Sequence, residues 1–192
     1  MKPTRRLLPA LMLGAGLSLC LASGAVRAGE ELEWSRQLAR ATWPGDIVRW
    51  ADQVPGSDPA AGQAQDVRRR AAEVLSLLRS QDVQLFRSAF QTELGSAERN
   101  ADLRRAALGD ADAAFRIARL YQAGQVQPGA SKDDHRYIGW LQLAAKLGHE
   151  RAAYDLALHF RREGQLVQAS AYEARAVALG YTPPLALDHV RK

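Results

Sequence analysis

An internal repeat in the second half of this chain constrains its fold more than any other feature. A pattern of one glycine, paired small residues and aromatic residues returns 39 positions later. The matching positions are Gly109, Ala113, Ala114, Phe115, Ile117, Ala118 and Tyr121 in the first copy, and Gly148, Ala152, Ala153, Tyr154, Leu156, Ala157 and Phe160 in the second. A period of this length is typical of arrays in which one small structural unit stacks on the next.

A second match, at an offset of 32 positions, indicates that each unit is a pair of helices. It places Trp140, Ala144, Leu147 and Gly148 over Tyr172, Ala176, Leu179 and Gly180. The alanines allow helices to approach closely, and the aromatic residues fill the spaces between them. The glycines Gly109, Gly148 and Gly180 stand where a left-handed residue is expected to end each second helix.

The rest of the sequence also favours helices, because good helix formers dominate it and no alternating apolar stretch of useful length occurs. We expect helices over Glu30–Trp43, Asp46–Gln53 and Gln65–Arg79, with an exposed linker over Val54–Gln63. A further helix, capped by Ser80 or Asp82 and ending at Gly95, is predicted to form an αα-hairpin with the one before it. Its apolar stripe would contain Val83, Phe86, Ala89, Phe90 and Leu94.

Residues 110–148 resemble a Sel1-like repeat, a relative of the tetratricopeptide repeats. The residues that carry the resemblance are Ala113-Ala114, Ile117-Ala118, Leu120-Tyr121, Gly124, Asp133 or Asp134, Trp140, Ala144-Ala145 and Leu147-Gly148-His149. Residues 149–180 resemble the family more loosely, because the acidic loop element is missing, Glu163 precedes Gly164 with one extra residue, and Tyr172 replaces the tryptophan. Ser96 starts a helix that would close an earlier, degenerate unit, and Thr182 would open a capping helix ending near Val190.

The expected fold is therefore all-α, an αα-hairpin repeat array (a short solenoid) with an N-terminal helical extension. Residues 1–28 are expected to be a signal peptide, residues 29–95 an N-terminal helical region of unknown role, and residues 96–192 the repeats with their capping helix.

The signal peptide is predicted from basic residues that precede an uncharged run, Leu7–Val26, and a small residue at Ala28. The alternatives are an uncleaved membrane anchor, since about 20 apolar residues can span a bilayer, and lipidation at Cys20, although Leu19 before it is not small. Arg5 and Arg6 leave both the general and the twin-arginine export routes open. We expect a periplasmic protein with no stable membrane anchor after cleavage.

Removal of this segment abolishes the apparent basicity of the chain. The whole chain has 26 Lys and Arg against 21 Asp and Glu. The first 28 residues contain four of the basic residues and none of the acidic ones, which leaves 22 against 21. A chain with so little net charge gives no reason to expect nucleic-acid binding, and without Cys20 it has no disulfide or thiol chemistry.

No set of residues in the sequence predicts catalysis, and we expect no cofactor, no metal site and no enzyme activity. The histidines, His135, His149, His159 and His189, show no metal-ligand spacing. His149 is expected to be a cap or surface residue, and Asp133-Asp134 to stabilise a helix N-terminus. A cell-wall hydrolase would have to draw on carboxylates such as Glu31, Glu33, Asp46, Asp52 and Glu73.

The resemblance implies a protein-binding module, with another protein as its partner. An adaptor or scaffold of an envelope complex is the first interpretation, and an immunity protein that inhibits a toxic enzyme is the alternative. The candidate contacts, on the exposed face of the first helices, are Arg116, Arg119, Gln122, Arg151, Asp155, His159 and Arg162. An ordinary polar surface would also explain these residues.

Cleavage after Ala28 makes a direct prediction: the exported protein begins at Gly29, as N-terminal sequencing and intact mass would show. Cys20→Ser should leave this processing unchanged. A mass that retains the first 28 residues, or one that depends on Cys20, would contradict the prediction.

Overall fold

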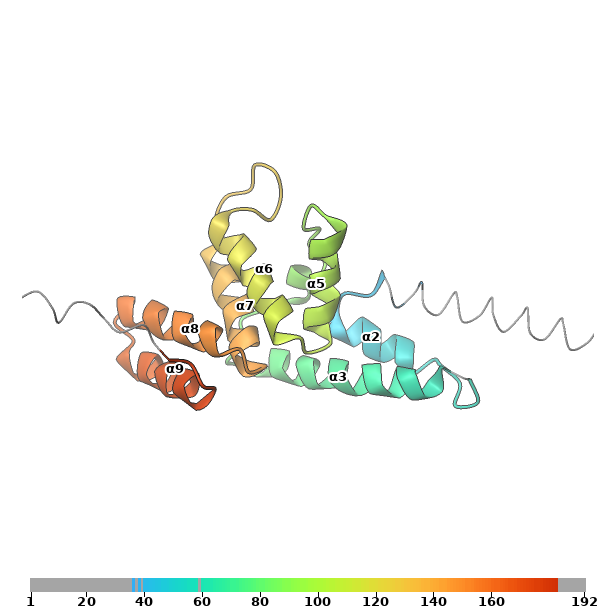
Figure 1. Ribbon diagram of the computed structural model, residues 1–192. Helices are drawn as coiled ribbons and strands as arrows, with labels where there is room; N and C mark the ends of the chain where they lie inside the picture. Colours follow the sequence, from blue (N-terminus) through green and yellow to red (C-terminus); the bar gives the residue numbers. More distant parts are fainter. Residues whose placement is uncertain (1–35, 37, 39, 59, 183–192) are drawn as a thin grey trace, which may run out of the picture. The chain divides into compact units, whose positions relative to one another are not determined.

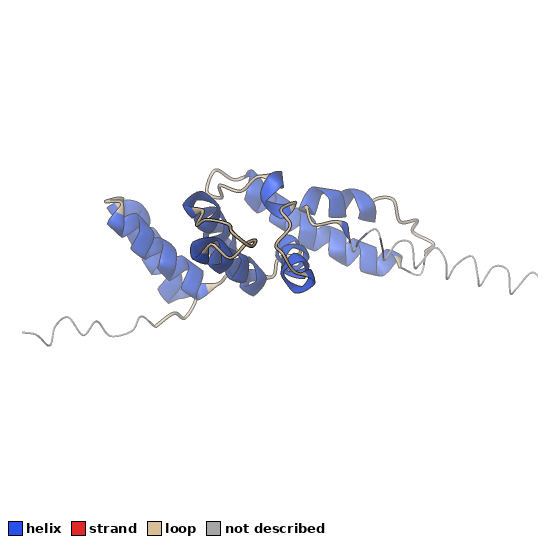
Figure 2. Ribbon diagram, turned by 90° about the horizontal axis from the view of Figure 1, so that it is seen from above, coloured by secondary structure: helices blue, strands red, loops and turns tan. Residues whose placement is uncertain are grey.

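The computed structural model describes residues 36, 38, 40–58 and 60–182, and within them it contains helices and loops but no strand (Figures 1 and 2). The helices are α2 (Pro44–Ala51), α3 (Ala61–Arg79), α4 (Arg87–Phe90), α5 (Ala97–Ala107), α6 (Ala111–Ala123), α7 (Asp134–Lys146), α8 (Glu150–Arg162) and α9 (Leu166–Ala178). All of them belong to one compact unit, Ala39–Lys192. None of these helices combines the length and the hydropathy that a membrane span requires.

Helices that are neighbours in the chain pack against one another. The pairs in contact include α2 with α3, α5 with α6, α6 with α7, α7 with α8, and α8 with α9, while α3 also contacts α5 and α7. In both views α6 lies beside α7, and α8 beside α9 (Figures 1 and 2). The prediction of an all-helical fold is confirmed for the described residues.

The alanines predicted to let helices approach closely are buried at these contacts. All eight are at most 2% exposed: Ala113, Ala114, Ala118, Ala144, Ala145, Ala152, Ala157 and Ala176. The largest fully buried side chain is Trp140, whose ring lies 4.7 Å from that of Phe90. Phe90 in turn meets Trp43 edge to face at 5.4 Å, so an aromatic cluster joins the N-terminal region to α7.

Helix α7 is the most deeply buried element. Each of its nine residues from Tyr137 to Ala145 is buried, whereas an amphipathic surface helix buries one stripe. The non-helical segment 80–86 lies against it: Gln84 donates its backbone N–H to Oε1 of the buried Gln142 at 2.8 Å. Gly139 permits this contact, because a Cβ there would lie 2.6 Å from the Gln84 carbonyl oxygen.

Three of the predicted helix starts are confirmed. Ser96, Asp133 and His149 precede α5, α7 and α8, and each side chain accepts a hydrogen bond from the backbone N–H three residues later. Asp110 does the same for α6. These bonds satisfy backbone donors that a helix leaves free at its N-terminus.

The predicted glycine stops are also confirmed. Gly109, Gly148 and Gly180 all have a positive φ, at 89°, 104° and 92°. After α7, the His149 N–H donates to the Ala144 carbonyl at 2.9 Å, the long-range bond of a Schellman cap. The chain can thus leave α7 and start α8 almost at once.

The helix predicted between Ser80 and Gly95 is wrong. Residues 80–82 form a bend and a turn, residues 83–86 are not helical, and α4 has only four residues, so the αα-hairpin expected there does not form. Ser80 caps the end of α3 by donating to the Leu77 carbonyl, and Asp82 pairs with Lys146 of α7. Val83 and Leu85 are buried against α7 while Phe86 is 77% exposed, because contacts with α7 override the local helical pattern.

Other predicted boundaries need smaller corrections. Helix α2 starts two residues earlier than expected, with Pro44 at its first position, where the missing N–H of proline costs nothing. Helix α3 starts at Ala61, so the expected linker loses its last three residues. The signal peptide and the capping helix lie outside the described residues, as do eight of the fourteen residues of the first predicted helix.

Gly139 gives a test of this packing. Gly139→Ala should lower the free energy of unfolding by about 1–3 kcal/mol, because the added methyl group would meet the Gln84 carbonyl oxygen and the buried side chain of Leu85. Gly62→Ala in α3 is the control, since its Cβ would meet nothing within 4 Å. It should be neutral or stabilising by up to about 1 kcal/mol. Urea denaturation measures both, and equal effects would contradict the contact.

Candidate binding groove between α6 and α8

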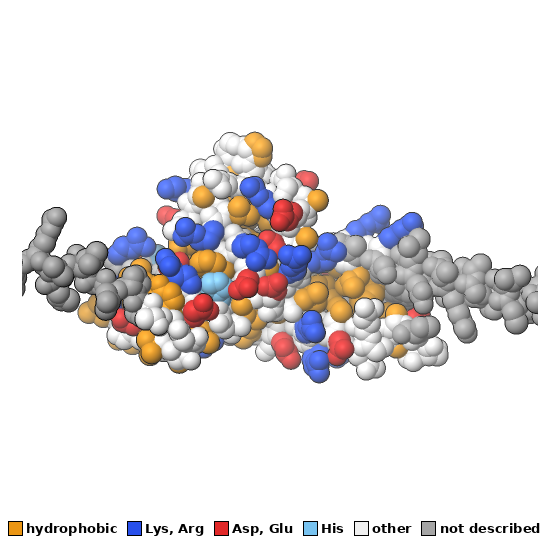
Figure 3. Space-filling view, viewed as in Figure 1, with side chains coloured by type: hydrophobic (Ala, Val, Ile, Leu, Met, Phe, Trp, Pro, Cys, Tyr) orange, Lys and Arg blue, Asp and Glu red, His pale blue; other side chains and the backbone are white. Residues whose placement is uncertain are grey.

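Helices α6 and α8 border a groove of about 430 Å³. Its lining residues are Arg119 and Gln122 from α6, Tyr137 from α7, and Arg151, Asp155, Leu158, Arg161 and Arg162 from α8. Figure 3 shows basic side chains gathered around hydrophobic ones on the face that α6 and α8 present. The groove has the size of a site that holds a few residues of a partner.

Helical spacing brings the α8 residues together. Arg151, Asp155, Leu158 and Arg162 follow one another at intervals of four, three and four positions, which places them on one stripe. The alternate face of α8, with Ala152, Ala153, Leu156 and Ala157, is buried against its neighbours. Packing of the alanine-rich face therefore turns the charged stripe toward α6.

Asp155 lies in the groove as a nearly buried carboxylate, 8% exposed. Its Oδ1 accepts a hydrogen bond from Nε of Arg151 at 2.9 Å. Its Oδ2 is buried and has no hydrogen-bond partner among the described residues. Because buried polar atoms are normally paired, this oxygen is the one unusual polar feature of the groove.

Tyr137 contributes a hydroxyl from α7. Burial raises its pKa above the ordinary value of 10.0, and the Asp155 carboxylate raises it further, while Arg119 and Arg162 oppose the shift. Both causes keep the hydroxyl protonated at neutral pH. Tyr137 can therefore donate a hydrogen bond inside the groove.

The arginines give the groove an excess of positive charge. Arg151 pairs with Asp155, and Arg161 pairs with Glu173 of α9 at 2.6 Å. Arg119 hydrogen-bonds Gln122, which is neutral. Neither Arg119 nor Arg162 forms an ion pair with a described residue, so two guanidinium charges are uncompensated.

Five of the seven predicted contact residues line this groove: Arg119, Gln122, Arg151, Asp155 and Arg162. Asp155 was expected to be exposed and is buried instead, since α8 packs closely around it. The sequence reasoning missed Tyr137, Leu158 and Arg161. Leu158 could have been found from its place in the stripe, whereas Tyr137 comes from α7 and needed the tertiary structure.

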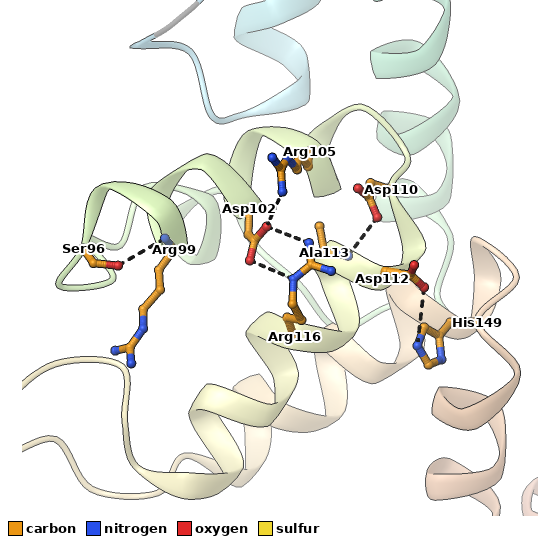
Figure 4. A network of polar contacts seen from close by, with 9 residues as sticks. All are labelled: Ser96, Arg99, Asp102, Arg105, Asp110, Asp112, Ala113, Arg116 and His149. Atoms are coloured by element: carbon orange, nitrogen blue, oxygen red, sulfur yellow. Dashed lines mark hydrogen bonds and ion pairs between the residues drawn. The ribbon is translucent and has the colours of Figure 1, made fainter.

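Arg116 and His159, also predicted, do not line the groove. Arg116 turns toward α5 and forms two hydrogen bonds with the buried Asp102, from Nε at 3.0 Å and from Nη2 at 2.8 Å (Figure 4). This pairing raises the pKa of Arg116. His159 is half-buried, and its ring meets that of Phe160 edge to face.

Residues that the sequence offered for metal binding or catalysis instead cap helices or form ion pairs. His149 caps α8 through Nδ1, stacks on Phe115 at 4.1 Å and directs Nε2 toward Asp112 at 3.7 Å (Figure 4). Asp46 and Asp52 pair with Arg87 and Arg68. Within the described residues, no group of three or more His, Cys, Asp or Glu could hold a metal ion.

Two larger cavities have fewer features of a binding site. One of about 850 Å³ lies along α3, α5 and the end of α7, and its charged lining residues are of both signs: Arg70, Arg105, Lys146, Glu73 and Asp110. Another of about 480 Å³ is lined mainly by glutamines, with Asp82 and Lys146 paired across it. Neither has a buried polar side-chain atom without a partner, so the α6–α8 groove is the better candidate site.

Comparison with known proteins adds no identity: no family model, no curated protein and no solved structure matches the chain.

The different settings of Arg116 and Arg162 predict different effects on stability. Arg116→Ala should lower the free energy of unfolding by about 1–3 kcal/mol, because buried Asp102 would keep only a longer contact to Arg105. Arg162→Ala should change it by less than about 0.5 kcal/mol. Urea denaturation of both variants is the measurement, and a larger loss for Arg162→Ala would contradict these assignments.

Proposed function

We propose that this protein is an exported module that binds another protein through the α6–α8 groove, and that it is not an enzyme. The observation that carries the proposal is the groove itself, whose lining combines Arg119 and Arg162, which form no ion pair with a described residue, with a buried Asp155 oxygen that has no hydrogen-bond partner among the described residues. Such a set of groups is suited to recognition of a polar segment. The hypothesis of a hydrolase has no comparable support in the contacts of Asp46 and Asp52.

We further propose that residues 96–192 form Sel1-like helical repeats. In this proposal α6 and α8 are the first helices of two successive units, and α7 and α9 are the second helices. The equal lengths of these four helices support it. So do three glycines with a positive φ at corresponding positions, Gly109, Gly148 and Gly180. First helices of repeat arrays line a concave surface, and the groove lies between two of them.

The N-terminal region serves, in this proposal, as a cap for the array. Support comes from its contacts with α7: Phe90 packs on Trp140, Gln84 bonds Gln142, and α3 touches both α5 and α7. Terminal units of a repeat array need a partner for the face that would otherwise meet solvent. None of the residues that line the groove belongs to this N-terminal region.

We infer a periplasmic location from the N-terminal signal, and an adaptor role in an envelope complex from the proposed repeats. An immunity protein remains the second interpretation. The identity of the partner separates the two, because a scaffold binds an assembly component whereas an immunity protein binds and inhibits a toxic enzyme.

The proposal predicts that charge reversal in the groove abolishes partner capture. Wild-type protein tagged at its C-terminus should capture one stoichiometric partner from the exported fraction after mild cross-linking, as mass spectrometry would show. Arg119→Glu and Arg162→Glu should each lose most of that partner, because each places a carboxylate in the groove.

Arg79→Glu, at the end of α3 and outside the groove, is the matched control and should capture as the wild type does. Circular dichroism must show all variants folded. Equal capture by every variant would show that the partner binds outside the groove. Hydrolysis of glycan or peptidoglycan by the purified protein would contradict a binding role.

A further inference from the structure

The chemistry of the groove limits the kind of segment that can occupy it, and this inference rests on the binding function proposed above. We propose that the groove takes an extended acidic segment of the partner protein, and that this segment also presents a hydrogen-bond donor to Asp155. The two requirements come from different parts of the lining.

The requirement for acidic groups comes from Arg119 and Arg162. The other two arginines of the groove already face carboxylates, Arg151 that of Asp155 and Arg161 that of Glu173. Guanidinium groups form two parallel hydrogen bonds with a carboxylate, which makes them selective for planar anions. Two such groups, from α6 and from α8, line the same groove, which favours a segment with more than one carboxylate.

The requirement for a donor comes from Asp155. Asp155 lines the groove, and its Oδ2 is buried and accepts no hydrogen bond from the described residues. A ligand made of anionic groups alone would leave this oxygen unpaired and would be repelled by its charge. A peptide meets both needs, because its backbone N–H groups and hydroxyl side chains are donors that alternate with acidic side chains.

Tyr137 and Leu158 fit the same kind of ligand. Tyr137 lines the groove, and its hydroxyl, which is protonated at neutral pH as that of any tyrosine is, can donate to an incoming carboxylate. Leu158 is 36% exposed in the groove and offers an apolar contact for the stem of a glutamate side chain. A nucleic-acid backbone would use neither Leu158 nor the free Asp155 oxygen.

The test is fluorescence anisotropy of purified mature protein with a fluorescein-labelled peptide, Gly-Glu-Ser-Glu-Gly-Glu, and a counterpart in which glutamine replaces every glutamate. The acidic peptide should bind, with an affinity that falls as sodium chloride rises, and the glutamine peptide should bind at least about tenfold more weakly. Arg119→Gln and Arg162→Gln should each weaken the acidic peptide about tenfold, and Arg79→Gln should not.

Asp155→Asn tests the donor requirement through the sign of its effect. If Asp155 only repels acids, the variant makes the groove more positive and tightens binding. If Asp155 accepts a donor from the peptide, the variant weakens binding although the groove is more positive. We expect weaker binding, in a variant whose urea unfolding shows it to be folded.

Equal affinity for the two peptides, tighter binding by Asp155→Asn, or tighter binding of a short oligothymidylate than of the acidic peptide would each overturn the proposal. The cross-linking experiment shows whether a failure concerns only the acidic segment or the proposed binding function as well. If the groove captures a native partner but does not bind the acidic peptide, the protein-binding function is supported and the proposal of an acidic ligand segment is wrong.

Discussion

The close contact between Gly139 of α7 and the backbone of Gln84 is the constraint on which the described fold depends. It lets the non-helical segment 80–86 lie directly on α7, where Gln142 accepts a hydrogen bond from the Gln84 N–H. With that segment in place, the chain brings Phe90 onto Trp140, and α7 is buried along nearly its whole length. A side chain at position 139 would force these layers apart, because it would meet the Gln84 backbone and the buried side chain of Leu85.

Helix α8 connects this packing to the proposed function. One of its faces is rich in alanine and buried, and the opposite stripe lines the groove. Asp155 belongs to both, since close packing buries it while its Oδ2 remains without a partner. Close packing thus produces both stability and a polar group that a ligand can satisfy. The Arg116–Asp102 pair shows the other outcome, in which a charged pair joins two helices and takes no part in the groove.

The repeat pattern predicted the C-terminal half well because its signals are local. Caps such as Ser96, Asp133 and His149, and stops such as Gly148, act through the backbone of the same few residues. The segment 80–94 was predicted wrongly because its apolar spacing suits a helix, whereas its contacts are with α7, more than 50 positions further along the chain. Of the candidate site, the charged stripe of α8 could be predicted from spacing, but Tyr137 could not.

The sequence by itself determined that the described part of this chain is helical, where the helices of residues 96–180 start and stop, and which alanines lie at their contacts. These properties follow from backbone hydrogen bonding and residue size within a few positions. Only the tertiary structure decided that Arg116 pairs with Asp102 and that α6 and α8 border a groove with Tyr137. It also decided that Asp155 is buried, with one oxygen that has no hydrogen-bond partner among the described residues. The reason is physical: burial and charge pairing depend on which residues from distant parts of the chain exclude water from the same place.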